Sequence, residues 1–384
     1  MFISKPPHAI RPVGVDLIEI AIEPGFDFLS HEYRSLQERS QATAFQEGGW
    51  LDAIHRQIAP AMATELVTVT ARVKPSGKLI FVLPLTRRRR GGLTVLEFAD
   101  FGLCDYLSPV YDPADAPFLL AESTLSRRLQ RLLPPCDIIS LAKMRSDNPV
   151  LERLFPNTRR ARMRVSAYPV AIGKNWNDWR AARLRPSLRS ELDLKRRRLT
   201  RRSEPVFLLI EQESEIIRAF DALRSFRADR FSERGTRDLI ENQAIFSFYR
   251  QIAINGARAG TARTYCLYLS GEPAAVMFGL VHRRTFSLLL VGFDLVRYRR
   301  LSVGLLAIED TIRASIEAGD AIYDFTIGDY RYKQQFGAQP VSLHEWHAAQ
   351  TIRGYLALLG IQIVRETKRA LKPIIKGELR SQRD

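Results

Sequence analysis

Residues 262–337 limit the possible folds of this chain more than any other part of the sequence. The stretch opens with three segments of strand-like composition separated by short turns: 262–269, 273–282 and 285–293. After a basic loop, large aliphatic residues recur at helical spacing: Leu305, Ile308, Ile312 and Ile316. Residues 322–327 are again typical of a strand, which ends at Gly328 and Asp329. This order predicts an α/β (α+β) domain.

The loop before this helix has the features of an anion-binding site. It carries Arg299 and Arg300 and runs through Ser302 to Gly304 directly into the helix. The first amides of a helix have no partner within the helix, so they attract anions, and a glycine lets the backbone approach a phosphate. The residues that we expect to bind a phosphate-containing cofactor are Arg299, Arg300, Leu301, Ser302, Val303 and Gly304.

The same stretch resembles the acyl-CoA loop and following helix of the GNAT N-acyltransferase superfamily. More narrowly, it resembles the branch of cellulose- and exopolysaccharide-biosynthesis acetyltransferases with BioF2-like domains, which is distantly similar to the FemABX peptidyltransferases. The residues that carry the resemblance are Tyr298, Leu301, Ser302, Gly304, Asp324-Phe325, Gly328-Asp329, Tyr332-Lys333 and Phe336-Gly337. The resemblance implies a GNAT fold and an acetyl-CoA or other acyl-CoA donor, with no metal.

Acyl transfer to an amine needs an unprotonated nucleophile, a polarised carbonyl and a proton for the leaving thiolate. Asp329 is our candidate base or acceptor-positioning group, although an Asp after Gly328 could also cap a turn. Tyr332 could protonate the thiolate, or simply pack. The candidate substrate-binding residues are Asp324, Lys333 and Arg227. Their structural alternatives are a buried pairing with an arginine for Asp324 and an ordinary surface position for Lys333.

The N-terminal part repeats the outline of helices, a three-strand meander, a helix and a strand. With 384 residues the chain suits two domains. We expect a degenerate GNAT-like domain at 1–165 that shapes the acceptor cleft, a GNAT acyltransferase domain at 166–350, and a basic helix at 351–384. The tandem arrangement is what the resemblance implies, because sequence identity between the halves is not visible.

The chain has a net charge of +16, and residues 159–202 alone hold 15 Lys or Arg. A row of arginines at 196–198 is expected to face outward on a helix spanning 176–202, whose buried side is marked by Leu188, Leu192 and Leu199. Such charge fits either a solvated helix face or attraction of a polyanion. Candidate partners are an acyl-carrier protein, an acidic glycan or an anionic membrane surface, and we do not favour nucleic acid.

Several function classes lack sequence support. The motifs of serine hydrolases, zinc proteases and P-loop NTPases are absent, and neither the six histidines nor the three cysteines have metal-ligand spacing. The first residues lack the apolar core of a signal peptide, and no apolar run approaches the length of about 18 residues that spans a bilayer. We therefore expect a cytoplasmic protein, with a place at the inner face of the membrane left open.

Together these features predict an acyl-CoA-dependent N-acyltransferase. The resemblance implies an acceptor amine, small or glycan-linked, in polysaccharide or cell-envelope biosynthesis. One alternative is a FemABX-like transferase that uses aminoacyl-tRNA, which the positive charge favours. The other is a non-catalytic scaffold of an exopolysaccharide machine.

Overall fold

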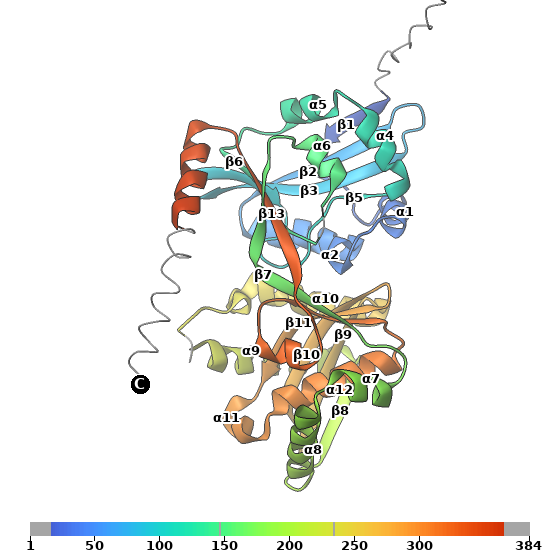
Figure 1. The fold of residues 1–384 in the computed structure, drawn as a ribbon, viewed down its shortest axis with the longest axis vertical. Helices are drawn as coiled ribbons and strands as arrows, with labels where there is room; N and C mark the ends of the chain where they lie inside the picture. Colours follow the sequence, from blue (N-terminus) through green and yellow to red (C-terminus); the bar gives the residue numbers. More distant parts are fainter. Residues whose placement is uncertain (1–16, 146, 233–234, 365–384) are drawn as a thin grey trace, which may run out of the picture.

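The computed structural model describes residues 17–145, 147–232 and 235–364. Within these residues the strands form one continuous sheet, flanked by helices on both faces (Figure 1). The strand order is β1-β2-β3-β4-β6-β13-β7-β12-β11-β10-β9-β8, with β5 paired to β3. The mixed α/β class predicted from the sequence is confirmed.

The N-terminal half contains seven strands among its described residues, together with short helices and a π-helical turn at Ile54–Ile58. Its strands are β1 (Ile18–Ile22), β2 (Glu65–Val73), β3 (Leu79–Arg90), β4 (Leu93–Phe98), β5 (Val110–Tyr111), β6 (Ile138–Met144) and β7 (Arg159–Ala171). Its helices are α1 (His31–Arg39), α2 (Gly48–Ala53), α3 (Ala59–Ala61), α4 (Ala116–Ala121), α5 (Leu125–Leu132) and α6 (Pro149–Leu154).

The C-terminal half carries the longer helices. Its strands are β8 (Pro205–Ile210), β9 (Ala262–Leu269), β10 (Glu272–His282), β11 (Thr285–Phe293), β12 (Ile322–Ile327) and β13 (Val341–Ala349). Its helices are α7 (Trp176–Arg183), α8 (Pro186–Thr200), α9 (Glu213–Ser232), α10 (Gln243–Ala259), α11 (Leu295–Tyr298), α12 (Val303–Glu317) and α13 (Arg331–Gln335). A further helix, without a label in Figure 1, covers residues 352–364.

The two halves repeat one topology, as the tandem prediction requires. In the N-terminal half β1 to β4 are antiparallel neighbours, and β4 then pairs in parallel with β6. In the C-terminal half β8 to β11 are antiparallel neighbours, and β11 pairs in parallel with β12. Near the carboxyl end of β6 and of β12 a register shift coincides with a left-handed residue, Lys143 (φ 63°) and Thr326 (φ 58°).

Strands β7 and β13 join the halves into one sheet. The last residues of β7 pair with β12, whereas its first residues pair with β13, and β13 pairs in turn with β6 of the N-terminal half. Figure 1 shows the two strands running together between the upper and lower halves. The expected boundary between residues 165 and 166 therefore falls inside β7, so each half contributes a strand beside the other half's sheet.

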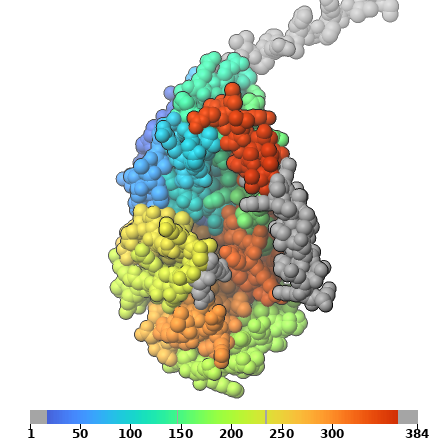
Figure 2. All heavy atoms as spheres, turned by 90° about the vertical axis from the view of Figure 1, so that its left-hand side faces the viewer, coloured from blue at the N-terminus to red at the C-terminus, as the bar shows by residue number. Residues whose placement is uncertain are grey.

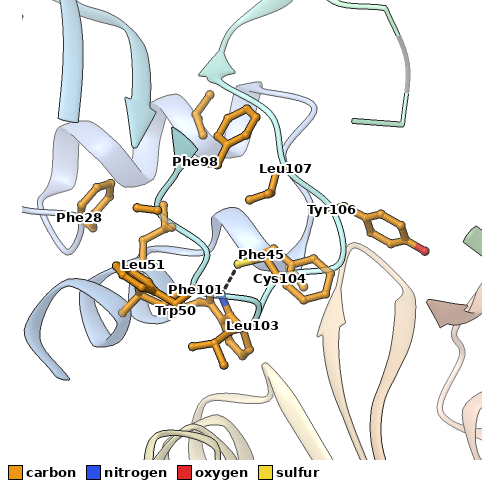
Figure 3. Packing of buried hydrophobic residues seen from close by; sticks show 14 of the residues in the cluster. Phe28, Phe45, Trp50, Leu51, Phe98, Phe101, Leu103, Cys104, Tyr106 and Leu107 are labelled. Atoms are coloured by element: carbon orange, nitrogen blue, oxygen red, sulfur yellow. Dashed lines mark hydrogen bonds between the residues drawn. The ribbon is translucent and has the colours of Figure 1, made fainter. Parts of the chain in front are cut away.

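A shared hydrophobic core also links the halves. Phe248 of α10 lies 4.9 Å, between ring centroids, from Trp50 of α2, and both belong to one buried cluster. The indole of Trp50 donates a hydrogen bond to the sulfur of Cys104, 3.2 Å away (Figure 3). A second cluster, on the opposite face of the C-terminal sheet, is covered by α7, α8 and α12. The loop that carries Cys104 is thus fixed against both halves.

Two local expectations were wrong, and a third is tested only in part. The segment 176–202 forms two helices, α7 and α8, because the residue before Pro186 is held in an extended conformation. Arg196 does not face solvent freely but pairs with Glu309 and Asp310 of α12. Arg197 and Arg198 are exposed as expected. The basic end of the C-terminal helix, beyond residue 364, lies outside the described residues.

Candidate functional site

The candidate site forms where β11 and β12 separate. These strands pair only from Thr285 to Ser287 and from Ile322 to Asp324, after which β11 continues to Phe293 paired with β10 but not with β12. The left-handed Thr326 turns the backbone at this point, and its hydroxyl donates to the Leu288 carbonyl at 3.0 Å. The carbonyl groups that follow the bulge no longer belong to the β11 ladder and are available to side chains.

Lys333 of α13 occupies this position. Its ammonium donates to the carbonyls of Thr326 at 3.1 Å and Ile327 at 2.9 Å, and the residue is only 2% exposed. Burial lowers its pKa to about 8, against the partly compensating charges of nearby carboxylates. An ammonium has three protons, and these two bonds use two of them. The expectation of a surface lysine is therefore excluded.

The glycine before this helix leaves room beside the amine. Gly328 has φ 117°, a conformation that favours glycine. A Cβ there would lie 2.9 Å from the Tyr330 ring and 3.7 Å from the Nζ of Lys333. A side chain at 328 would therefore crowd the approach to the ammonium.

Asp324 is held at the centre of the bulge. It is 1% exposed and accepts hydrogen bonds from the Thr326 amide at 2.8 Å and from the Tyr106 hydroxyl at 2.9 Å. Burial raises its pKa. Neither hydrogen bond comes from an arginine, and Arg145 acts on Asp324 only through its charge, so the arginine pairing that we considered takes a weaker form. These bonds fix the bulge and attach the N-terminal half to it.

A loop of the N-terminal half completes the group. Half-buried Asp105 interacts with the Thr326 side chain and the Ile327 amide, and burial raises its pKa. Lys143, the left-handed residue of β6, donates to Asp100 at 2.5 Å and to the Cys104 carbonyl at 2.7 Å. Asp105 and Lys143 were not among the predicted site residues. The pair Asp105-Tyr106 lies in a loop without periodicity, which gives sequence analysis no signal to use.

Asp329 lies at the exposed edge of the same group. Its carboxylate accepts from the Tyr168 hydroxyl at 2.9 Å and from the Ser166 amide at 3.3 Å, both on β7. The Lys333 ammonium lies 5.4 Å from the centre of the Tyr168 ring. The structure thus brings Asp329 and Lys333 to one place, with the aspartate reachable from solvent and the lysine behind it.

Tyr332 packs beside this site. Its ring lies 5.9 Å from that of Phe325 and stacks on Tyr330 at the same centroid distance. Burial raises its pKa to about 12. Within the part of the chain that the structure describes, its hydroxyl makes no hydrogen bond, so the group can still donate to a bound molecule.

Arg227 does not join the group. Its guanidinium holds Asp238 with two bonds of 2.6 and 2.7 Å and also donates to the Val291 carbonyl at 3.3 Å. The Asp238 side chain is 2% exposed. This bidentate pair fastens α9 to the loop before α10, which gives Arg227 a structural role.

The predicted donor loop forms a short turn into α12. Ser302 is left-handed at φ 54°, and α12 begins at the next residue. Arg299 and Arg300 are exposed, and among the described residues neither side chain has an ion-pair partner. Leu301 and Val303 are buried in the core, so only their backbone could contact a ligand. A Cβ at Gly304 would lie 3.0 Å from the Phe293 ring, so close packing as well as any ligand favours glycine there.

A cavity of about 350 Å³ is lined mainly by residues of the N-terminal half. Its lining includes Tyr106, which donates to Asp324, and Arg145, whose guanidinium lies 4.9 Å from the centre of the Tyr106 ring. The described residues contain no group of three or more side chains suited to a metal ion.

Residues 186–334 match the family model described as an acetyltransferase (GNAT) domain. This segment of the chain is therefore similar to a GNAT acetyltransferase domain. The match contains α8 to α12, β12 and most of α13, and therefore includes the donor loop, the bulge and Lys333. A search of curated proteins finds no match.

Solved structures share the fold of almost the whole chain. FemX aligns with a TM-score of 0.58 at 12% identity, covering 88% of this chain and 99% of its own. The C-terminal domain of a putative lysylphosphatidylglycerol synthetase from Agrobacterium fabrum aligns with a TM-score of 0.53 at 14% identity, covering 89% and 97%. L-PGS from Bacillus licheniformis has a TM-score of 0.50 at 12% identity, covering 91% and 99%. At these identities the likeness is one of fold.

Proposed function

We propose that this protein transfers an acyl group from an activated donor to an amine, and that the reaction takes place beside Lys333. The observation that carries the proposal is the nearly buried ammonium at the strand opening, bound to two carbonyls and left with one further proton. A cation in a site that excludes water stabilises developing negative charge far better than one in solution.

The geometry supports direct transfer. The acceptor nitrogen attacks the donor carbonyl carbon, whose oxygen becomes negative and is stabilised by Lys333. Asp329 takes a proton from the amine, or holds the amine in position. The bond from the carbonyl carbon to the leaving group then breaks, and Tyr332 supplies the proton that this group requires. Asp105 and Asp324 act by positioning the bulge.

Acetyl-CoA or another acyl-CoA is the donor that we propose. The free arginines Arg299 and Arg300 stand at the start of α12, where unpaired helix amides also favour phosphate. In line with the sequence resemblance, we place the acceptor in polysaccharide or cell-envelope biosynthesis, in the cytoplasm or at its membrane face.

The likeness to FemX and to lysylphosphatidylglycerol synthetases favours a second candidate for the donor, an aminoacyl-tRNA. Both donors carry phosphates, which lie close to the reactive ester in an aminoacyl-tRNA and at the other end of the pantetheine arm from the thioester in an acyl-CoA, so the same two arginines would serve either. The donor can therefore be decided only by binding and turnover.

Calorimetry with acetyl-CoA and gel-shift titration with a charged tRNA test the two donors. We expect acetyl-CoA to bind, and the variant Arg299→Ser/Arg300→Ser to weaken it roughly ten- to a hundredfold, since a charge-assisted contact contributes about 1.5–3 kcal/mol. Arg127→Ser/Arg131→Ser removes the same charge on α5 and should leave binding unchanged. Binding of tRNA alone would select the second candidate, and binding of neither would favour a scaffold without catalysis.

A further inference from the structure

The C-terminal helix, residues 352–364, presents an apolar face to solvent. Its exposed side chains include Ile352 (81%), Tyr355 (59%), Leu356 (60%) and Leu359 (41%). Their spacing of three, four and seven residues places them on one side of a helix, which is the pattern that a soluble helix normally turns toward its core. In this helix the opposite face is the one that contacts the body of the protein.

The helix is anchored to the body through this other face. A Cβ at Gly354 would lie 2.0 Å from the Asp137 carbonyl oxygen, so only glycine permits the contact. Thr351 donates to the Asp137 carboxylate at 2.6 Å, and Arg353 donates to the Gly92 carbonyl at 3.0 Å. These contacts at the beginning of the helix set its orientation. In this orientation the apolar face points to solvent.

Basic side chains lie beside the helix. The Arg353 contact places the helix beside the tip of the β3–β4 hairpin, where Arg89 and Arg90 are exposed. Figure 2 shows the helix in red at the surface next to atoms of the N-terminal half. Arg90 pairs with Glu97, but Arg89 has no ion-pair partner among the described residues. The sequence after the helix, residues 365–384, contains seven Lys or Arg and three Asp or Glu.

We propose that this helix docks the protein on the surface of an anionic phospholipid membrane. An interfacial helix combines an apolar face with flanking basic residues, so that the former enters the boundary of the acyl chains while the latter meet the lipid phosphates. A protein partner would require acidic groups facing these arginines, whereas anionic lipids provide negative charge without a specific shape.

Thirteen residues of helix span roughly 20 Å, less than the bilayer core of about 30 Å. No described helix is long and apolar enough to cross a membrane. The helix thus lies along the surface.

Flotation with lipid vesicles tests the proposal on the full chain. We expect the protein to bind vesicles of phosphatidylcholine containing about a third phosphatidylglycerol, and to bind pure phosphatidylcholine weakly. Leu356→Asn/Leu359→Asn should reduce binding to the anionic vesicles at least about tenfold. The matched control is Leu208→Asn/Leu209→Asn on edge strand β8, where the leucines are 48% and 44% exposed, and it should bind like the wild type.

Three results would overturn the proposal. They are failure of the wild type to bind anionic vesicles at low salt, equal binding by the helix variant, and a dimer in sedimentation velocity that the helix variant dissociates. The last result would assign the apolar face to contact between two copies of the chain. Donor binding at Arg299 and Arg300 is measured without vesicles, so the transferase proposal stands or fails separately.

Discussion

At the scale of single residues, the buried surroundings of Lys333 disfavour the charged form of its side chain. Its pKa of about 8 in the folded chain compares with an ordinary value of 10.5. Between these two pH values the unfolded chain holds a proton that the folded chain has released, so raising the pH favours folding. Below pH 8 both states are protonated, and the cost of burying the charge is present in full.

The free energy of unfolding should therefore gain a contribution from Lys333 as pH rises from about 8 to 10.5. Urea unfolding across this range should show a smaller rise for Lys333→Met than for the wild type. The exposed Lys174, changed to Met, is the control and should keep the rise. Parallel curves for Lys333→Met and the wild type would mean that Lys333 is not the buried cation described above.

Activity should respond in the opposite direction. If the ammonium stabilises the transition state, turnover falls as pH rises through about 8 and Lys333 loses its proton. We expect Lys333→Met to lower turnover by about 10²–10³ at neutral pH, in the range seen when one donor to an oxyanion is removed. Turnover that stays constant through this pH range would remove Lys333 from the reaction.

Asp329 allows a second test, because its neighbours separate the chemical role from the structural one. We expect Asp329→Asn to lower turnover by about 10²–10⁴ with little change in donor affinity, and to recover partly relative to the wild type as the pH rises toward the pKa of Lys333, about 8, because more of the acceptor amine is then neutral. Tyr168→Phe removes the hydroxyl that donates to Asp329 but keeps the carboxylate, and should cost much less. Equal small losses in both variants, with lower melting temperatures, would make Asp329 a turn residue.

The sequence predicts part of this site, and the reason is the spacing of residues within one short segment. Asp324 lies in β12 and Asp329 and Lys333 follow it, all within ten positions, so local pattern is enough to single them out. Tyr106 meets Asp324 across 218 positions, and Tyr168 meets Asp329 across 161. Contacts of this kind depend on how two halves of a sheet are joined, which no local periodicity encodes.

At the scale of elements, ion pairs join α8 to α12. The sequence suggested that this side of α8 is a solvated face. Arg196 donates to Glu309 at 2.8 Å and to Asp310 at 2.7 Å, and Arg180 of α7 donates to the same Glu309 at 2.7 Å. The Glu309 side chain is 2% exposed, so its charge depends on these partners. Helical spacing indicates Leu192 and Leu199 as core residues but cannot show which arginines of the polar face meet a carboxylate.

Arg196→Gln should therefore destabilise the protein by about 1–3 kcal/mol, since it removes charged hydrogen bonds from a buried carboxylate that keeps only Arg180. The adjacent Arg197→Gln makes the same substitution at an exposed position and should change stability by less than about 0.5 kcal/mol. Chemical denaturation of both variants provides the comparison. Equal stability would return Arg196 to the solvated face that we first expected.

At the scale of the whole molecule, the exchange of β7 and β13 between the halves has a consequence for folding. Most strands of the meanders agree closely with the sequence prediction, for example 262–269 and 322–327. The exchange itself could not be predicted, because β7 is an ordinary strand in the sequence and its partner depends on register over nearly 200 positions. A chain divided after residue 165 would separate β7 into two parts.

We therefore expect the intact chain to unfold in one cooperative transition. Leu343→Ala on β13 removes a side chain that is 0% exposed in the core shared by the two halves, and should cost about 2–5 kcal/mol. Because β13 is also bonded to β7, which continues into β12, the loss should shift the unfolding of both halves together. Single-tryptophan versions that retain only Trp50 or only Trp179 report on the shared core and on the second cluster of the C-terminal half respectively, and Leu208→Ala at the exposed edge of β8 is the control. Coincident shifts of both probes would support one folding unit.

A shift confined to Trp50 would mean that the C-terminal half keeps its structure without β13. The two-domain division predicted from the sequence would then describe independent units.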